Sequence, residues 1–379
     1  MFLAVSSQLY LLLDCLCCSC YSAESNLIVS AKNKQGVRIV RNTHLIFFEG
    51  LPGSGKSTMA HFIARQLKHA AICSTWYYEV NKWHPLTPFH DMTSFLQFRA
   101  LAQATQFHMI FDRYLERWRS FADQLQQTGE VALADSGLFG SLTWMLFSTL
   151  MPETEFHRYL EQVHEIIAAL DPCLIYLSQE DALTSLKRWL TRQGGEAEKN
   201  AIESKTASPY GKQHHLTGFD GLLHYWEDYQ RLIYRAFLHF PGRKIEIDTT
   251  ASNRLHSQQQ AADFLDVPLT HDLSLSQKDL QRFVGSYRSL DHEEVCVVEY
   301  GNGLLSLRGP IVVWQHTRLI PMDLTTFEVE SLPFVVSFVT DGQGRVKRLV
   351  MNGPEQFLHT VNHVYHLIEP AERKEIAVS

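Results

Sequence analysis

The stretch LIFFEGLPGSGKST, residues 45–58, decides the fold of the first part of the chain. An apolar run typical of a buried strand stops at a glycine, and the loop after it fits the pattern G-x-x-x-x-G-K-[ST]. The residues that follow, TMAHFIARQLKHA (58–70), have the period of an amphipathic helix. Glycines in such a loop turn backbone N–H groups inward, so that the loop and the helix N-terminus form an anion site. The stretch therefore predicts a phosphate-binding loop.

The loop itself supplies the predicted nucleotide contacts. Lys56 is expected to neutralise the β- and γ-phosphates, and the Ser57 hydroxyl to ligate Mg²⁺. The predicted cofactors are therefore ATP and Mg²⁺. The full set of predicted cofactor-binding residues comprises Gly50, Leu51, Pro52, Gly53, Ser54, Gly55, Lys56, Ser57 and Thr58.

From about residue 41 to 266, short apolar runs alternate with longer helical patterns, which predicts an α/β domain with a parallel sheet and helices on both faces. Continuous apolar runs such as LIFF, VALA and CLIYL are typical of strands buried on both sides. One long helical pattern runs from about Thr93 to Gln127. The expected strands are Leu45 to Glu49, Ala70 to Ser74, Val131 to Asp135, Cys173 to Ser178 and Lys244 to Asp248.

A second domain is expected after a linker at 267–276, which is rich in Ser, Thr, Asp and Pro. A short helix at Gln277 to Val284 precedes segments rich in β-branched and aromatic residues, separated by turn sequences such as GNG, DGQG and NGP. They predict about seven antiparallel strands closing into a small β-barrel over 277–370, with a tail at 371–379. The predicted strands contain EVCVVEY, LLSLR, IVVWQHT, FEVE, FVVSFVT, RVKRLVM and FLHTV.

Composition and charge narrow the classes of partner. The chain has 379 residues, with 34 Lys plus Arg against 41 Asp plus Glu, and no stretch gathers enough basic residues for a nucleic-acid footprint. No apolar run of about 18 residues could span a bilayer. We therefore expect a cytoplasmic protein with a small-molecule acceptor, no nucleic-acid partner and no stable membrane span. The oligomeric state stays open, a homodimer included.

The first 40 residues are expected to be a poorly ordered extension. They carry no Lys or Arg before Lys32, and Asp14 interrupts the apolar run, so that they make a poor secretory signal; a lipid-anchored or exported leader is the alternative. Cys15, Cys17, Cys18 and Cys20 are spaced too tightly for a paired zinc site. The other cysteines, Cys73, Cys173 and Cys296, are expected to be reduced core residues.

Residues 41–266 resemble the nucleoside and nucleotide kinases, thymidylate kinase in particular. No guanine-reading Asn-Lys-x-Asp pattern follows a later strand, and VALADS ends in one acid rather than two. The resemblance implies an acidic residue near the acceptor hydroxyl after the second strand, where Glu79 stands, with Trp76, Tyr77, Tyr78 and Trp83 able to stack on a flat substrate. Glu79 is interpreted either as an acid/base or orienting group or as a solvated turn residue.

The resemblance also implies an Asp-Arg pair at the end of the third strand, with the Asp beside Mg²⁺. Asp135 ends a predicted strand and is the expected metal-side carboxylate, whereas Asp112-Arg113 lies inside a helical pattern and is interpreted as a surface pair. Ser136 stands where the family has the arginine, which puts a nucleotide monophosphate substrate in doubt. Arg113 or Arg119, if facing inward, could substitute.

After the fourth strand, the resemblance implies a helix whose arginines close over the transferring phosphoryl group. Arg188 and Arg192 are four residues apart and share one helix face, which is also compatible with a solvated basic face. Residues 193–212 have the composition of a mobile lid. By position, Asp248 and Thr249 or Thr250 would open a loop near the adenine.

The C-terminal segment resembles the small lipocalin-like β-barrel modules appended to β-lactamase-related serine hydrolases, on Gly285, Tyr287, GNGLLSL and FVVSFVTDGQGRVKRLVM. No Ser-x-x-Lys nucleophile occurs in the chain. We interpret the barrel as a ligand-binding or protein-docking module. Its histidines are interpreted as scattered rather than as a metal site; they are His292, His316, His359, His363 and His366.

Two functions compete. The first is an ATP- and Mg²⁺-dependent kinase that acts on a nucleoside, nucleotide or other small hydroxylated molecule, with Lys56, Glu79, Asp135, Arg188 and Arg192 as its catalytic residues and Ser57 and Asp135 as metal ligands. The second is an ATP-binding switch or ATPase whose barrel docks a partner or ligand. The acidic and aromatic residues after the second strand favour transfer.

Overall fold

The computed structural model of the chain describes residues 42–79, 81–87, 89–251, 253–291, 294–309, 312–357, 359 and 361–368. The predicted N-terminal extension with its four close cysteines, the tail at 371–379 and His292 lie outside these residues. The chain divides into two compact units, Met1–Thr270 and His271–Ser379, and this division falls inside the expected linker at 267–276.

The first unit contains a five-stranded sheet in the order β2-β3-β1-β4-β5, in which every neighbouring pair is parallel. The expected α/β architecture is therefore confirmed. The strands are β1 (Leu45–Gly50), β2 (Ser74–Tyr77), β3 (Val131–Asp135), β4 (Cys173–Ser178) and β5 (Arg243–Asp248).

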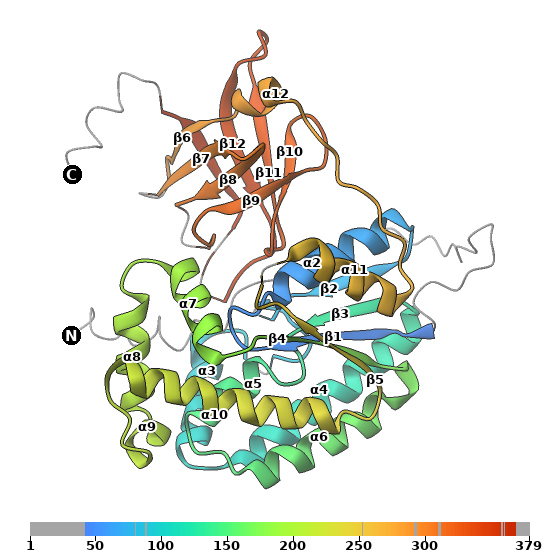
Figure 1. Cartoon of the computed structure of the whole chain (residues 1–379), viewed down its shortest axis with the longest axis vertical. Helices are drawn as coiled ribbons and strands as arrows, with labels where there is room; N and C mark the ends of the chain where they lie inside the picture. The colour runs from blue at the N-terminus through green and yellow to red at the C-terminus, as the bar shows by residue number, and fades with distance from the viewer. Residues whose placement is uncertain are drawn as a thin grey trace. The chain divides into compact units, whose positions relative to one another are not determined.

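Helices cover both faces of this sheet, with α2 and α11 on one face and α4, α6 and α10 on the other (Figure 1). The helices of this unit are α2 (Lys56–His69), α3 (Met92–Gln103), α4 (Phe107–Thr128), α5 (Ser141–Phe147), α6 (Glu153–Ile167), η2 (Ala168–Leu170), α7 (Ala182–Gln193), α8 (Ala197–Ala207), α9 (Pro209–Gln213), α10 (Gly218–His239) and α11 (Arg254–Leu265).

The central strand β1 is buried along its whole length, and alternate side chains enter different cores. Ile46 and Phe48 pack in one hydrophobic cluster with residues of α2 and α11. Phe47 lies against aromatic rings of the opposite layer, Trp118 of α4 at 6.0 Å and Phe240 at 6.2 Å between ring centroids. This packing fixes the end of β1, where the loop 50–58 begins.

The expected long helix is in fact two, α3 and α4, because the chain turns at Thr105, whose φ of 55° lies in the left-handed region. Asp91 caps α3 by accepting a hydrogen bond from the Ser94 N–H at 2.7 Å. Strand β2 begins at Ser74 rather than Ala70, so that Cys73 is exposed and the prediction of a core position for it was wrong. Cys173 and Cys296 are buried free thiols, as expected.

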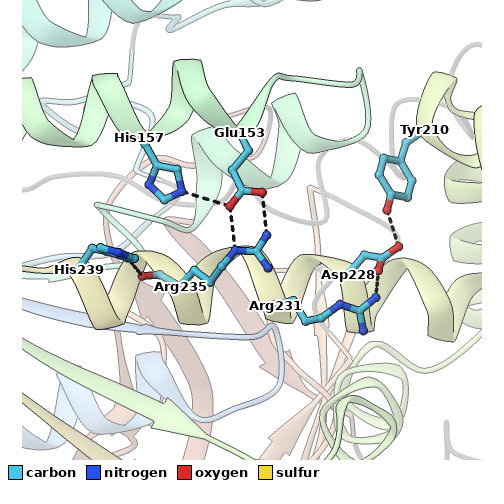
Figure 2. Close-up of polar contacts among 7 residues, drawn as sticks. All are labelled: Glu153, His157, Tyr210, Asp228, Arg231, Arg235 and His239. Carbon is cyan, nitrogen blue, oxygen red and sulfur yellow. Dashed lines mark hydrogen bonds and ion pairs between the residues drawn. The ribbon is translucent and has the colours of Figure 1, made fainter.

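The long helix α10 makes polar contacts with α9, which follows β4, and with α6 (Figure 2). Tyr210 of α9 donates its hydroxyl hydrogen bond to Asp228 of α10. Seven residues after Asp228, Arg235 of α10 forms a two-point pair with Glu153 of α6, with N–O distances of 2.8 and 2.7 Å. Helix α10 therefore contacts α9 near its middle and α6 near its C-terminal end.

The second unit is a closed antiparallel barrel of eight strands in the order β10-β11-β12-β13-β6-β7-β8-β9, which confirms the predicted barrel. A short helix, α12 (Gln277–Gln281), precedes it. The strands are β6 (Gly285–Ser289), β7 (Val295–Gly301), β8 (Leu304–Arg308), β9 (Thr317–Pro321), β10 (Thr326–Val329), β11 (Phe334–Thr340), β12 (Val346–Asn352) and β13 (His363–Leu367).

Side chains occupy the interior of the barrel. In β11, buried and partly exposed residues alternate, and the buried Phe338 stacks on Phe283 at 4.3 Å between centroids. Tyr287 and Tyr365, from the two strands that close the barrel, are fully buried. Two of the predicted strands were misplaced: of IVVWQHT, Thr317 begins a strand, and of FLHTV, His359 forms an isolated bridge with Gln356.

The backbone of the last residue of the first unit is held by a side chain of α2. The amide of Gln66 accepts a hydrogen bond from the Thr270 N–H at 2.7 Å and donates one to the Thr270 carbonyl at 3.2 Å. Gln66 is fully buried. The start of the linker is therefore fixed to the helix that follows the loop 50–58.

Candidate functional site

The loop 50–58 joins the end of β1 to the first turn of α2, as the sequence predicts. Its glycines adopt backbone conformations that other residues disfavour, with φ of 143° at Gly50, 85° at Gly53 and 99° at Gly55. A Cβ atom at Gly53 would lie 2.4 Å from the Ser185 carbonyl oxygen, whereas one at Gly55 would meet nothing within 4 Å. The first glycines therefore serve close packing, and Gly55 opens helix α2 beside free space.

Lys56 lies at the first helical position and is buried. Its Nζ donates a hydrogen bond to the Leu51 carbonyl at 3.1 Å, so that the side chain curls back over the loop. A buried ammonium group is costly unless it meets an anion or acceptors. The loop thus carries one enclosed positive charge at the N-terminal end of a helix, where the helix dipole also favours an anion.

Asp135, at the end of β3, is fully buried beside this loop. Its pKa is raised to about 7, first by burial and then by the charge of Glu79, while Lys56 and hydrogen bonding by Ser57 oppose the shift. The structure therefore brings together Lys56, Ser57 and Asp135, three residues that the sequence singled out from segments far apart in the chain.

Glu79 joins the same cluster from the turn after β2. It keeps part of its surface exposed, yet burial of its carboxyl raises its pKa, against the opposing effects of Lys56 and a hydrogen bond from Ser136. The Ser136 hydroxyl also bonds the Asp135 Oδ1 at 3.4 Å. Ser136 has a left-handed backbone, with φ of 56°, which is unusual for a residue with a side chain. Ser136, which stands where the nucleoside and nucleotide kinases have an arginine, therefore contacts two carboxyl groups.

Glu49 is a site residue that the sequence reasoning missed. It is fully buried at the end of β1, and its Oε1 accepts hydrogen bonds from the N–H groups of Leu138 at 2.7 Å and Phe139 at 3.2 Å. Burial raises its pKa to about 8, although these two bonds and Lys56 lower it. Its place directly before Gly50 is the one signal in the sequence that could have found it.

A cavity of about 560 Å³ opens beside the loop. Gly53, Gly55 and Thr58 border it on the loop side, and Leu177 contributes an apolar wall. Its charged lining is entirely basic and comprises Lys187, Arg188, Arg192 and Arg254. A pocket of this size and charge next to an anion-binding loop suits the remainder of a phosphorylated ligand.

Arg188 and Arg192 both line this cavity, so the helix face predicted from their spacing does meet the loop. Arg188 is held by the segment after β5, since its guanidinium donates to the carbonyl oxygens of Thr249 at 2.8 Å and Thr250 at 2.6 Å. Thr249 also lines the cavity, and its hydroxyl donates to the Ser54 carbonyl at 3.0 Å. The closure of these arginines over a phosphoryl group stays a prediction.

The segment expected to be a lid, 193–212, folds largely into α8 and α9. Lys205 of α8 is buried, with its Nζ 4.4 Å from the centroid of the Trp144 ring and 5.4 Å from that of Tyr225. Together with the bond between Tyr210 and Asp228, this contact docks both helices on α10. Whether they move stays a prediction.

Several predicted contacts are not formed. Arg113 and Arg119 are both exposed on α4, so neither faces inward to replace the family's arginine; Asp112 is exposed as well, which agrees with a surface pair. Two aromatic residues after β2 are used in packing rather than presented to a ligand: Trp76 stacks on His61 at 5.0 Å, and the Tyr77 hydroxyl donates to Glu130.

No family model matches the chain, and no curated protein matches its sequence. Within the described ranges, no helix is both long and apolar enough to cross a membrane. Among the same residues, no group of three or more His, Cys, Asp or Glu side chains is arranged to hold a metal ion. A metal at this site would therefore depend on fewer protein ligands, completed by a bound phosphate and water.

Proposed function

We propose that the chain is an ATP- and Mg²⁺-dependent phosphotransferase that acts on a nucleoside, nucleotide or other small hydroxylated molecule. The observation that carries the proposal is the meeting of Lys56, Ser57 and Asp135 at the loop 50–58. A cation, a hydroxyl and a carboxyl at one anion-binding loop are the groups that phosphoryl transfer requires. The basic cavity beside the loop favours a nucleotide over free phosphate as the ligand, because it offers room for more than a phosphate group.

ATP would place its phosphates on the N–H groups of the loop and on Lys56, with its nucleoside in the adjoining cavity. Ser57 and Asp135 would hold Mg²⁺, since hydroxyl and carboxylate oxygens are the ligands that this cation prefers. When bound, the cation neutralises charge on the phosphate oxygens. It would also favour the ionised form of Asp135, whose pKa burial raises to about 7.

The acceptor would lie near Glu79 and Asp135. Burial raises the pKa of both carboxyl groups, and an ionised carboxylate with a raised pKa is a stronger proton acceptor for a hydroxyl. Ser136 bonds to both carboxyl groups and offers no positive charge to an acceptor phosphate. Within the proposed range of substrates, this favours an acceptor hydroxyl on a molecule without a phosphate of its own.

The test is a mass-spectrometric screen of the full chain with ATP, Mg²⁺ and a panel of nucleosides, nucleotides and other hydroxylated metabolites. We expect one class of acceptor to gain a phosphoryl group. Lys56→Ala should abolish both transfer and ATP binding measured by calorimetry, whereas Lys68→Ala, an exposed lysine at the other end of α2, should alter neither. Unchanged ATP affinity in Lys56→Ala would refute the proposal.

Glu79→Gln separates transfer from binding. It should lower the turnover number at least tenfold and leave ATP affinity within twofold, because Glu79 does not border the cavity beside the loop. Formation of ADP without a phosphorylated acceptor, by wild-type protein across the whole panel, would favour the alternative of an ATPase or switch.

A further inference from the structure

A second cavity, of about 430 Å³, lies on α4 and shares no lining residue with the cavity beside the loop. Four polar residues of α4 line it at spacings of four, three and four, so they form one stripe of the helix: Arg113, Arg117, Ser120 and Gln124. Pro85 and Phe121 add apolar surface. The cavity has the size of a small-molecule site, for which about 300–1,000 Å³ is typical.

Arg117 is a partly buried cation that has no acidic partner among the described residues. Its guanidinium donates to the Pro85 carbonyl at 3.3 Å and lies 3.5 Å from His90 Nε2. Burial lowers its pKa, and its charge adds to the burial that lowers the pKa of His84 to about 3. Across the described ranges, no carboxylate forms an ion pair with Arg117 or Arg113. A desolvated guanidinium of this kind gains most from an anion.

We propose that this cavity binds a small molecule through an oxyanion, a phosphate or carboxylate group held between Arg113 and Arg117. Guanidinium groups present paired N–H donors whose geometry matches both kinds of oxyanion. The Gln124 amide and Ser120 hydroxyl extend the polar stripe beyond the two arginines. Because the cavity is larger than a bare anion needs, Pro85 and Phe121 would contact the rest of the ligand.

Glu116 predicts a variant that should bind an oxyanion more tightly. It lines the same cavity and brings one negative charge against the two positive charges of the arginines. Its carboxylate would repel a bound oxyanion, so Glu116→Gln should tighten binding several-fold. A surface that attracts anions only through its overall charge would gain far less from this single change, because salt screens charges that are not close together.

The experiment titrates inorganic phosphate into the full-length Lys56→Ala protein, in which the loop 50–58 has lost its cation, and follows the heat of binding. We expect saturable binding that Arg113→Ala and Arg117→Ala each weaken at least tenfold. Arg119→Ala removes an exposed arginine from the same helix but outside the cavity, and it should leave the affinity unchanged. Arg113 is exposed, so its variant is expected to fold even if Arg117→Ala does not.

A parallel titration with malonate distinguishes the two oxyanions: tighter phosphate binding assigns a phosphorylated ligand, and tighter malonate binding a carboxylate. Absence of saturable binding of either anion would overturn the proposal, as would equal affinities of Arg113→Ala and Arg119→Ala. Since these titrations use a chain without Lys56, their failure leaves the proposed phosphotransferase untouched.

Discussion

Glu49 joins two segments at the heart of the candidate site. Its carboxyl accepts N–H bonds from Leu138 and Phe139 and lies next to Gly50 in the chain. Its second oxygen, Oε2, is buried without a hydrogen-bond partner among the described residues. A protonated carboxyl would suit this environment, which agrees with the pKa of about 8 that burial imposes.

Glu49→Gln should remove part of the pH dependence of stability. The pKa of Glu49 is raised from 4.5 to about 8, so the folded chain binds a proton that the unfolded chain has lost, and this contribution to stability falls as pH rises through that window. Gln keeps the acceptor oxygen without the ionisation. We expect the free energy of unfolding to fall less between pH 5 and pH 8 in the variant, with a difference on the order of 3 kcal/mol.

Urea denaturation followed by tryptophan fluorescence at both pH values measures this difference. Glu161→Gln, which changes an exposed carboxylate of α6, is the matched control and should retain the wild-type profile. Equal pH dependence in wild type and Glu49→Gln would show that Glu49 is ionised in the folded protein at pH 5 to 8.

The sequence could predict Lys56, Ser57 and Asp135 as one site because each follows from a local rule: a loop pattern, or a carboxylate at the end of a buried strand. Glu49 could not be predicted in the same way. Its raised pKa depends on burial and on N–H groups some 90 positions away in the chain. The alternative in which Arg113 or Arg119 faces inward was wrong, because the buried face of α4 is formed by its apolar residues and both arginines are exposed.

At the scale of elements, the hydrogen bond from Tyr210 to Asp228 is one of the polar contacts that hold α9, which follows α8, on α10 (Figure 2). Tyr210→Phe should loosen these helices, since a hydrogen bond to a charged group contributes about 1.5–3 kcal/mol. We expect amide hydrogen exchange in 197–213 to become about tenfold faster or more, as measured by mass spectrometry.

Tyr234→Phe is the matched control for this experiment. Tyr234 is on α10, the helix that carries Asp228. Its hydroxyl donates to Glu246 of β5 at 3.1 Å, away from α8 and α9. Its loss should leave exchange in 197–213 as in wild type. If Tyr210→Phe also leaves that exchange unchanged, the apolar packing of Tyr210 against Phe147 and His214 is sufficient to hold α9.

The predicted boundaries of helices and strands agree with the structure where the local sequence pattern is strong. Val131–Asp135 and Cys173–Ser178 coincide with their predicted strands, because a continuous apolar run between turn residues is unambiguous. The break between α3 and α4 carries no Gly or Pro, and Thr105 adopts its left-handed backbone without such a signal. Strand β6 pairs with β13, so that closure of the barrel is set by contacts distant in sequence.

At the scale of the whole chain, every residue of the candidate nucleotide site lies in the first unit. Residues 42–270 alone should therefore fold and bind ATP with an affinity within about threefold of that of the full chain. A shorter piece, 42–266, lacks Val267 of the hydrophobic cluster as well as Thr270, whose loss leaves the buried amide of Gln66 without its two bonds. An unsatisfied buried polar group costs about 1–3 kcal/mol, so the shorter piece should unfold at lower temperature.

Calorimetry of ATP binding and thermal unfolding of the two pieces test this pair of expectations. Equal stability of 42–266 and 42–270 would show that Gln66 finds other partners, and loss of ATP binding by 42–270 would mean that the barrel contributes to the site. Neither result depends on what the barrel binds.

The enclosure of Lys205 by aromatic rings has a consequence for its chemistry. Acylating reagents attack an accessible amine, and the Nζ of Lys205 is buried against the rings of Trp144 and Tyr225. Lys199, on the same helix, is exposed and open to such reagents. The rate at which Lys205 is labelled relative to Lys199 therefore measures the fraction of time that α8 spends detached from α10.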